Sequence, residues 1–364
     1  MNDDSDTLAN RVRADNVGSL LRPPYLLDAR HAHADGDELR ELEDRAVIEA
    51  IALQEEIGLP ILTDGEYRRR FFFSTIEVLV DGIDPQGYVR HHRDAAGREQ
   101  ELRTPTPVKR LKRTGTLAEY ELRFVREHTS KPVKVAMPSP SLLNVYWTEG
   151  VSDRAYGSRQ EYLEHLIELM NEDAKLLAAQ GARYIQLDAP HYAYIQKVMA
   201  GVEDRDAKLR ELVEYDNRVF EGVEGAVTCL HICRGNDRSH FTGTEPYDEF
   251  AASIFPHAVA ERLLLEYDDE RSGGFAPLRY ARDDQTVVLG LVTSKRSELE
   301  RPDELKRRIE EAARYLPLDR LALSTQCGFA SNAEGNAITW DAQRAKLELV
   351  LSVARDVWGD AGGC

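Results

Sequence analysis

The chain has 364 residues, of which 42% are hydrophobic and 30% are charged, and its formal net charge is -17 at pH 7. This length and apolar content are ample for a large buried core. The strong negative charge argues against binding to nucleic acid or to an anionic membrane surface, because both partners are themselves negative.

No apolar run approaches the ~20 residues of a membrane-spanning helix. The acidic start, MNDDSDTLAN, lacks the basic region and apolar centre of a secretory signal peptide. The four cysteines, Cys229, Cys233, Cys327 and Cys364, are too few for a disulfide framework in so long a chain. We therefore expect a soluble, cytoplasmic enzyme whose cysteines are thiols that could serve as ligands.

Eight short apolar runs predict β-strands. In chain order they span 13–19, 59–65, 132–138, 183–190, 226–233, 261–268, 286–293 and 320–327. Longer amphipathic stretches at 37–58, 159–182 and 302–317 have apolar residues at helical spacing. Glycines in EEIGLP and AAQGA end two of these stretches, as is typical of helix C-caps.

The alternation of strands and helices indicates parallel strands joined by helical crossovers. The continuous apolar character of the strands fits a sheet that is buried on both faces. The count of eight favours a closed (β/α)8 TIM barrel, with residues 1–364 forming a single domain. An open doubly wound sheet is the alternative, which the absence of G-x-G-x-x-G after the first strand weakens.

One segment does not follow this alternation. Residues 74–130 contain a polar and then basic stretch rich in turn formers, GIDPQGYVRHHRDAAGREQELRTPTPVKRLKRTG. We expect an insertion after the second strand. It is either a hairpin that lies over the barrel mouth as a lid or a plain surface loop.

Residues capable of chemistry stand where the predicted strands end. They are Ser19, Asp64 with Glu66, Asp188, His231 with Cys233, Glu266 and Cys327, and Lys295 lies just past the seventh strand. In a parallel barrel the C-terminal strand ends share one face, and active sites lie on that face. We therefore expect these side chains to converge.

His231 and Cys233 stand two residues apart in VTCLHICRGN, so they point to the same side if the strand continues through both. Taken alone, the pair is better explained by core packing, as Cys229 is. A salt bridge would equally explain Glu266, and packing as a small apolar side chain would explain Cys327.

Taken together, these residues suggest a metal site. His231, Cys233, Glu266 and Cys327 offer one nitrogen, two sulfur and one oxygen ligand, a set that suits Zn²⁺ better than Mg²⁺ or Ca²⁺. Their spacing matches no zinc-finger pattern, so the fold itself would have to assemble the site.

Seven motifs then follow one another along nearly the whole chain: NVGSLLRP, ILTDGEYRR, YIQLDAP, LHICRGN, LLLEYDDERSGGFAPL, VVLGLVTSK and LSTQCGF. In these motifs the chain resembles the catalytic domain of cobalamin-independent methionine synthase. More broadly it is similar to the short single-barrel relatives of that enzyme, including epoxyalkane:coenzyme M transferase-like proteins. The resemblance implies a barrel fold and zinc-activated thiol chemistry.

The resemblance also implies roles for individual residues. The zinc ligands would be His231, Cys233, Glu266 and Cys327. The amino-acid part of a thiol such as homocysteine would be held by Gly18, Ser19, Glu66 and Asp188.

The chain departs from the family on the side of the alkyl donor. TSK replaces D-x-H-S, so Lys295 stands where the family has a histidine acid. Lys295 could hold an anionic group, or donate a proton if its pKa were lowered. The tryptophan that stacks on folate is absent, and SPSLLNVYW places Tyr146 or Trp147 nearby. The donor is therefore open between a methyl-pterin, a methyl-corrinoid and an epoxide.

Two further residues have alternative interpretations. Arg22, in LLRP, could pair with a substrate carboxylate or sulfonate, or form a structural ion pair. His191, in DAPHYAYI, could protonate a leaving group, although we favour an exposed loop position.

The sequence thus predicts a zinc-dependent methyltransferase of methionine biosynthesis, which alkylates a small-molecule thiol such as homocysteine. Asp188 and Lys295 would act in catalysis and Tyr146 in substrate binding. The alternatives are addition of another thiol to an epoxide or methyl-corrinoid, a metal-free uroporphyrinogen decarboxylase-like enzyme, and a zinc carrier without turnover. A homo-oligomer is compatible with the sequence.

Overall fold

The computed structural model describes residues 12–32, 35–93, 99–194, 199, 201–241 and 243–362. Cys364 and the acidic start of the chain lie outside the described residues.

Strands and helices alternate along the chain. The strands are β1 (Ala14–Asp15), β2 (Val80–Arg93), β3 (Glu99–Arg113), β4 (Lys134–Pro138), β5 (Tyr184–Asp188), β6 (Val227–Ile232), β7 (Arg262–Glu266), β8 (Thr286–Val292) and β9 (Leu321–Thr325). The longer helices are α2 (Pro24–His31), α3 (Gly36–Ile57), α7 (Arg159–Ala179), α9 (Arg205–Val219), α11 (Pro302–Ala312) and α12 (Trp340–Trp358). Short helices are α4 (Thr75–Leu79), α5 (Arg123–His128), α6 (Pro140–Leu143) and α10 (Ala251–Ile254).

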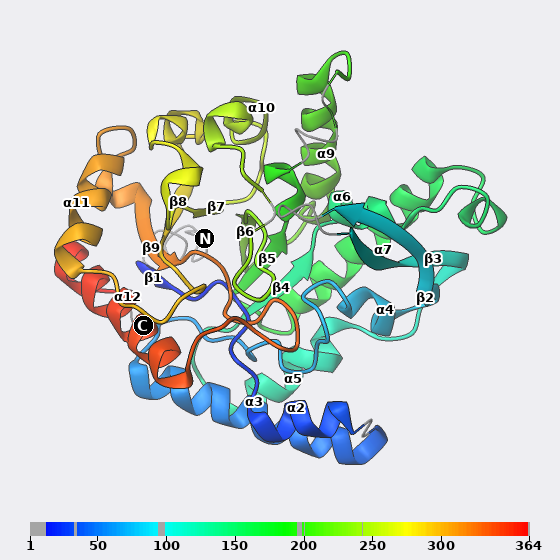
Figure 1. Cartoon of the computed structure of the whole chain (residues 1–364), viewed down its shortest axis with the longest axis horizontal. Helices are drawn as coiled ribbons and strands as arrows, with labels where there is room; N and C mark the ends of the chain where they lie inside the picture. Colours follow the sequence, from blue (N-terminus) through cyan, green and yellow to red (C-terminus); the bar gives the residue numbers. More distant parts are fainter. Residues whose placement is uncertain are drawn as a thin grey trace.

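Seven strands form one parallel sheet in the order β1-β9-β8-β7-β6-β5-β4. Every residue of these strands is buried. The sheet curls, and the long helices lie around its outside (Figure 1). The apolar runs therefore form a parallel sheet covered on both faces, as the sequence predicts.

The predicted strand at 59–65 does not form a regular ladder. It contributes one parallel bridge, between Leu62 and Val133. The side chain of Gln54 forms hydrogen bonds with both backbone groups of Thr63: its Oε1 accepts from Thr63 N at 3.0 Å, and its Nε2 donates to Thr63 O at 2.8 Å. The described sheet thus has seven strands, and its closure into an eight-stranded barrel stays a prediction.

The concave side of the sheet is filled by apolar side chains and an ion pair. The apolar cluster consists of Val12, Val17, Ile61, Tyr184, Val227, Cys229, Leu264, Val288 and Ala322. Cys229 is therefore a core residue, as predicted. Lys134 Nζ lies 2.6 Å from Asp15 Oδ1, and both side chains are fully buried. A pair of this kind is costly to break from one side, because a buried charge would be left alone.

The insertion contains an antiparallel hairpin, β2–β3, which confirms the hairpin alternative over a plain loop. It packs on the segment between β4 and α7 (Figure 1): Leu111 N donates to Tyr156 Oη at 2.8 Å, and the hydroxyls of Thr106 and Thr148 lie 3.1 Å apart. These contacts fix the hairpin beside the sheet, and its role as a lid stays a prediction.

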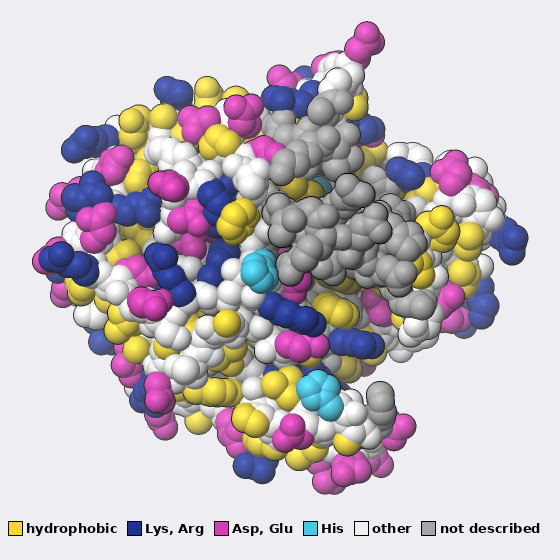
Figure 2. Space-filling model, in the orientation of Figure 1, with side chains coloured by type: hydrophobic (Ala, Val, Ile, Leu, Met, Phe, Trp, Pro, Cys, Tyr) yellow, Lys and Arg dark blue, Asp and Glu magenta, His cyan; other side chains and the backbone are white. Residues whose placement is uncertain are grey.

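Charged side chains of both signs are mixed over the face shown in Figure 2. Within the described part of the chain, no helix combines the length and the apolar character needed to cross a membrane.

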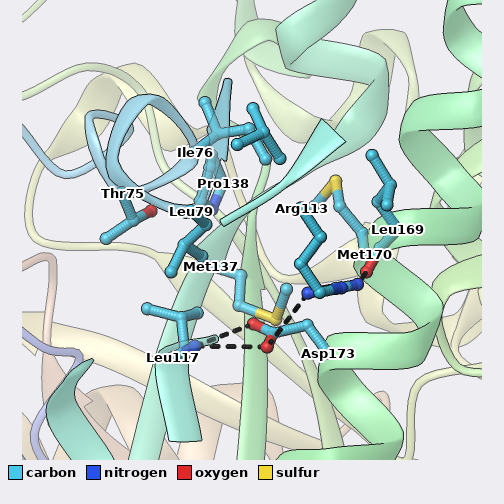
Figure 3. A pocket seen from close by; sticks show the side chains of 11 residues that line it. Thr75, Ile76, Leu79, Arg113, Leu117, Met137, Pro138, Leu169, Met170 and Asp173 are labelled. Atoms are coloured by element: carbon cyan, nitrogen blue, oxygen red, sulfur yellow. Dashed lines mark hydrogen bonds and ion pairs between the residues drawn. The ribbon is translucent and has the colours of Figure 1, made fainter. Parts of the chain in front are cut away.

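A small cavity lies where the insertion joins the sheet (Figure 3). Side chains from α4, β3, β4 and α7 line it, among them Asp173. Asp173 accepts hydrogen bonds from Leu117 N at 3.1 and 3.3 Å, and its Oδ1 lies 3.7 Å from Arg113 Nη1. Burial raises the pKa of Asp173 to about 7, although the Arg113 cation opposes this.

We predict that Asp173→Asn stabilises the protein more at pH 7.5 than at pH 4.5. The folded-state pKa lies above the unfolded value of about 3.9, so the folded protein binds this proton more tightly. The contribution of Asp173 to stability is therefore full below about pH 4 and is lost as the pH rises to about 7. Asparagine does not titrate and still accepts from Leu117 N. Tm at the two pH values measures the difference.

Asp283→Asn serves as the control, because the Asp283 side chain is fully exposed. Its Tm difference from wild type should not change with pH. Identical pH profiles for Asp173→Asn and wild type would show that Asp173 titrates as an ordinary carboxyl.

Candidate active site

The parallel register brings the predicted polar residues to one edge of the sheet. Asp188, the last residue of β5, pairs with His231 of β6. Glu266, the last residue of β7, pairs with Gly290 of β8. Cys233 directly follows β6, and Cys327 lies two residues beyond β9. Because parallel strands end on the same side, these five polar side chains come from neighbouring points of one edge.

Three of these residues form a buried cluster. One ligand atom each from His231, Cys233 and Cys327 lies within 4.8 Å of the others. His231 Nδ1 lies 3.1 Å from Leu264 O and must donate to it, which leaves the lone pair on Nε2. Within the described residues, no group donates a hydrogen bond to this buried Nε2. One imidazole nitrogen and two sulfurs, with the imidazole already oriented by its other nitrogen, fit Zn²⁺.

The pKa values of the two thiols in the cluster are shifted in opposite directions. The hydrogen bond from the Cys233 thiol holds the pKa of Cys327 well below its usual range, although burial opposes this, and His231 and Lys295 add to the effect. The same hydrogen bond and burial raise the pKa of Cys233. Of the two thiols, Cys327 is therefore the one that loses its proton more readily, and the thiolate is the form that binds metals.

Glu266, the fourth predicted ligand, is held by other groups. Its Oε2 accepts from Arg234 N at 2.8 Å. Its Oε1 accepts from Lys295 Nζ at 2.9 Å and from Arg271 Nη2 at 3.2 Å. The structure thus gathers three of the four predicted ligands, and coordination by Glu266 stays a prediction.

Lys295 does not have the lowered pKa that proton donation would require. Its Nζ lies 2.9 Å from Glu266 Oε1 and 3.6 Å from Asp268 Oδ2. Although burial opposes the charge, these carboxylates raise the pKa of Lys295. Lys295 is therefore a cation held in an ion pair.

Two buried carboxylates, Glu66 and Asp188, lie close to each other and to the cluster. Burial raises the pKa of Glu66 to about 8, with Asp188 adding to the effect against the opposing Arg69 cation. Burial raises the pKa of Asp188 to about 6, while His231 and the hydrogen bond from Gln186 lower it. Ionisation of one carboxyl group makes ionisation of the other less favourable. A positively charged ligand would stabilise both in the ionised form, so this part of the site favours a cation.

Gly18 and Ser19 lie between Glu66 and the loop that carries Cys327. A Cβ added to Gly18 would stand 2.5 Å from Glu66 Oε1, so any larger residue would displace the Glu66 carboxyl group from its present position. Ser19 Oγ accepts from Ala330 N at 3.2 Å, and a Cβ added to Gly328 would stand 2.1 Å from Ser19 Oγ. The structure therefore brings Gly18 and Ser19 into the same site as the two carboxylates and the cluster.

Tyr146 makes its contacts with the insertion. Its hydroxyl donates to Glu77 Oε1 at 3.3 Å, and its ring packs edge-on against Phe73 with centroids 6.5 Å apart. A substrate-binding role for Tyr146 stays a prediction.

Arg22 forms hydrogen bonds with the backbone in place of the structural ion pair considered from the sequence, and its pairing with a substrate anion stays a prediction. Its guanidinium donates to four backbone carbonyls, those of Glu66, Arg69, Ala330 and Asn332, at 2.7–3.1 Å. These bonds join the loop of Glu66 to the loop after Cys327. A lone arginine in LLRP gives no sequence signal for this role.

The expectation that His191 is exposed is wrong. Only 6% of it is accessible, and its Nε2 lies 3.0 Å from Ser141 Oγ, which in turn donates to Asp216 Oδ2 at 2.8 Å. Burial lowers the pKa of His191 to about 3. Its imidazole is therefore neutral at physiological pH, and the turn DAPHY gives no sign of this packing in the sequence.

Comparison with known proteins now assigns the chain to a family. The model of the catalytic domain of the cobalamin-independent synthase matches residues 25–356. The chain belongs to this family. The resemblance predicted from the motifs is therefore confirmed.

Individual relatives cover most of the chain. Uncharacterized protein YxjH of Bacillus subtilis (strain 168) is 35% identical, over 95% of this chain and 94% of its own length. Methionine synthase of Thermococcus kodakarensis is 24% identical, over 86% and 85% of the two chains. The 2-hydroxypropyl-CoM lyase of Xanthobacter autotrophicus is 26% identical, over 86% and 87%.

A solved structure shows the same fold. It is a B12-independent methionine synthase from Shewanella sp. W3-18-1 in complex with selenomethionine. It superposes with a TM-score of 0.75 at 22% identity, over 96% of this chain and 98% of the other.

We predict that the purified protein takes up about one zinc ion per chain, as a His/Cys/Cys cluster would. Cys233→Ser and Cys327→Ser should lose the metal or bind it far more weakly, because each removes a thiolate ligand. Metal content by atomic spectrometry after dialysis checks this. Cys229→Ala is the matched control and should keep the metal, because Cys229 lies in the apolar cluster. A wild-type protein that takes up no zinc would contradict the prediction.

Proposed function

We propose that this protein is a zinc-dependent methyltransferase that alkylates the sulfur of an aminothiol such as homocysteine. The carrying observation is the cluster of His231, Cys233 and Cys327 beside the carboxylates of Glu66 and Asp188. Membership of the cobalamin-independent synthase family supports the same chemistry.

The cluster supports the metal part of the proposal. Catalytic zinc sites use three protein ligands and leave a further position to substrate or water, and one nitrogen with two sulfurs supplies those three. Bound zinc would hold the substrate sulfur as a thiolate at neutral pH, where a free thiol with a pKa of about 8.5 is mostly protonated.

The carboxylates support an amino group on the thiol substrate. The nearest cation to Glu66 is Arg69, whose Nη1 lies 3.7 Å from Glu66 Oε1. The Arg69 guanidinium is already occupied by Glu121, with contacts of 2.8 and 2.6 Å. A substrate ammonium would supply the missing positive charge, whereas a thiol with an anionic tail would add a negative one.

The transfer itself forms one bond and breaks one. The thiolate sulfur attacks the methyl carbon, and the bond from that carbon to the donor breaks with its electron pair on the donor. The proton given up by the thiol balances the charge left on the donor. We assign the positioning of the aminothiol to Gly18, Ser19, Glu66 and Asp188.

We further propose that the chain is a single barrel domain and that it acts in the cytoplasm in methionine biosynthesis. Segment 59–65, second in chain order, would complete the barrel beside the seven described strands, and residues 74–130 would form its lid. Leu62 N donates to Pro132 O and Leu62 O accepts from Lys134 N, at 3.0 and 2.9 Å. Leu20 N donates to Gly65 O at 3.0 Å on the other side. Segment 59–65 therefore connects the residues after β1 with β4.

We predict turnover with homocysteine and a methyl donor. A screen of methyl-pterin, methyl-corrinoid and epoxide donors with homocysteine, 2-mercaptoethanol and 2-mercaptoethanesulfonate identifies the substrates. Glu66→Gln should raise KM for homocysteine about tenfold, the loss of about 1.4 kcal/mol, because it removes the partner of the ammonium. KM for neutral 2-mercaptoethanol should change little.

Glu149→Gln is the control, because Glu149 lies on an exposed turn. A wild-type preference for the sulfonated thiol would contradict the aminothiol proposal. Absence of turnover with every thiol and donor by a zinc-loaded protein would favour a carrier.

A further inference from the structure

Every polar atom of Glu266 already takes part in a hydrogen bond within the protein, although the sequence predicts that this residue is a metal ligand. Its side chain is fully buried. Lys295 and Arg271 donate to Oε1, and the backbone of Arg234 donates to Oε2. Its own backbone is also held, because Glu266 N donates to Tyr247 Oη at 2.7 Å and Glu266 O accepts from Ser272 Oγ at 2.7 Å.

The two cations are themselves held in place. Arg271 Nε donates to Asp269 Oδ2 at 2.8 Å, and its guanidinium stacks on Phe241 at 3.8 Å from the ring centroid. Lys295 has Asp268 as a second partner. Hydrogen bonds between charged groups in a buried setting are the strong ones, so this arrangement opposes movement of the Glu266 carboxylate.

We propose that Lys295 and Arg271 form a carboxylate clamp that holds Glu266 away from the metal, so that the resting centre has only His231, Cys233 and Cys327 as protein ligands. Glu266 has no oxygen in the set of ligand atoms within 4.8 Å. Lys295 is then a positioning residue. The fourth position is left to the thiol substrate, which need not displace a protein ligand.

The clamp rests on the proposed function only in requiring a metal at the cluster. It also accounts for a lysine at a position where the chain departs from the family's histidine acid. A histidine at residue 295 is shorter and carries a full charge only below a pKa of about 6.5, whereas Lys295 is charged at any physiological pH.

Metal affinity, measured by competition with a chromophoric chelator, tests the clamp in a double-mutant cycle. Glu266→Gln alone should change zinc affinity less than about threefold, because Glu266 is not a resting ligand. Lys295→Met should raise zinc affinity about tenfold, the scale of changes around metal ligands, because the freed carboxylate joins the metal. Glu266→Gln in the Lys295→Met background should remove that gain.

Two controls isolate the clamp. Lys295→Arg keeps a cation beside Glu266 and should leave affinity unchanged. Lys306→Met removes an exposed lysine that pairs with Asp356 at 2.7 Å and should also have no effect. Circular dichroism confirms that each variant is folded.

Cobalt-substituted protein gives a second readout. Adding homocysteine should add a sulfur-to-cobalt absorption band in wild type, at a lower thiol concentration than in Lys295→Met, where Glu266 competes. This difference depends on ligand exchange and not on turnover.

The outcomes separate the clamp from the proposed function. A loss of tenfold or more in zinc affinity on Glu266→Gln alone, with turnover in wild type, overturns the clamp and leaves the function. Failure of wild type to bind zinc or cobalt overturns both. Metal binding with the predicted cycle but without any turnover supports the clamp and overturns the function.

Discussion

The parallel pairing of the strands is the constraint on which the site depends. Parallel ladders in register place the strand ends at one edge, so Asp188 lies opposite His231 without any help from loops. Helices can then connect the strands at the outside, which buries both faces of the sheet. A one-residue slip of β6 against β5 would move the His231 side chain to the opposite face and dissolve the cluster.

The strand ends alone do not complete the site, since Ser19, Glu66 and the turn after Cys327 lie on irregular chain. Arg22 compensates for the missing ladder there by donating to carbonyls of both turns. Close approach of the turns then excludes a Cβ at Gly328, and a Cβ at Gly18 would displace the Glu66 carboxyl group. One cation thus satisfies backbone carbonyls that would otherwise be buried without donors, and it joins the turn of Glu66 to the turn after Cys327.

The sequence predicted what depends on local pattern and failed where distant partners decide. Apolar runs located seven of the strands, and strand-end polarity located the cluster. The apolar run LPILTDG predicted a second strand by the same pattern. In the structure, the side-chain amide of Gln54 forms hydrogen bonds with the backbone of Thr63, where a neighbouring strand would otherwise bind. The partners of Arg22 lie up to 310 residues away along the chain, and burial of His191 depends on Asp216 of a separate helix. No pattern within a window of sequence encodes such pairs.

The charged groups on the two sides of the cluster differ in sign: cations lie on the side of Glu266, and carboxyl groups lie on the side of Glu66 and Asp188. Lys295 and Arg271 stand on the side of Glu266 and neutralise its carboxylate, and Lys295 also helps to lower the pKa of Cys327. On the side of Glu66 and Asp188, Arg69 is bound to Glu121, so the two buried carboxyl groups lack a full counter-charge when they ionise. A molecule with a sulfur nucleophile at one end and an ammonium at the other matches this gradient in only one orientation. The orientation places the sulfur at the cluster, so the proposed selectivity for an aminothiol and the proposed alignment of its reacting atom have the same electrostatic origin.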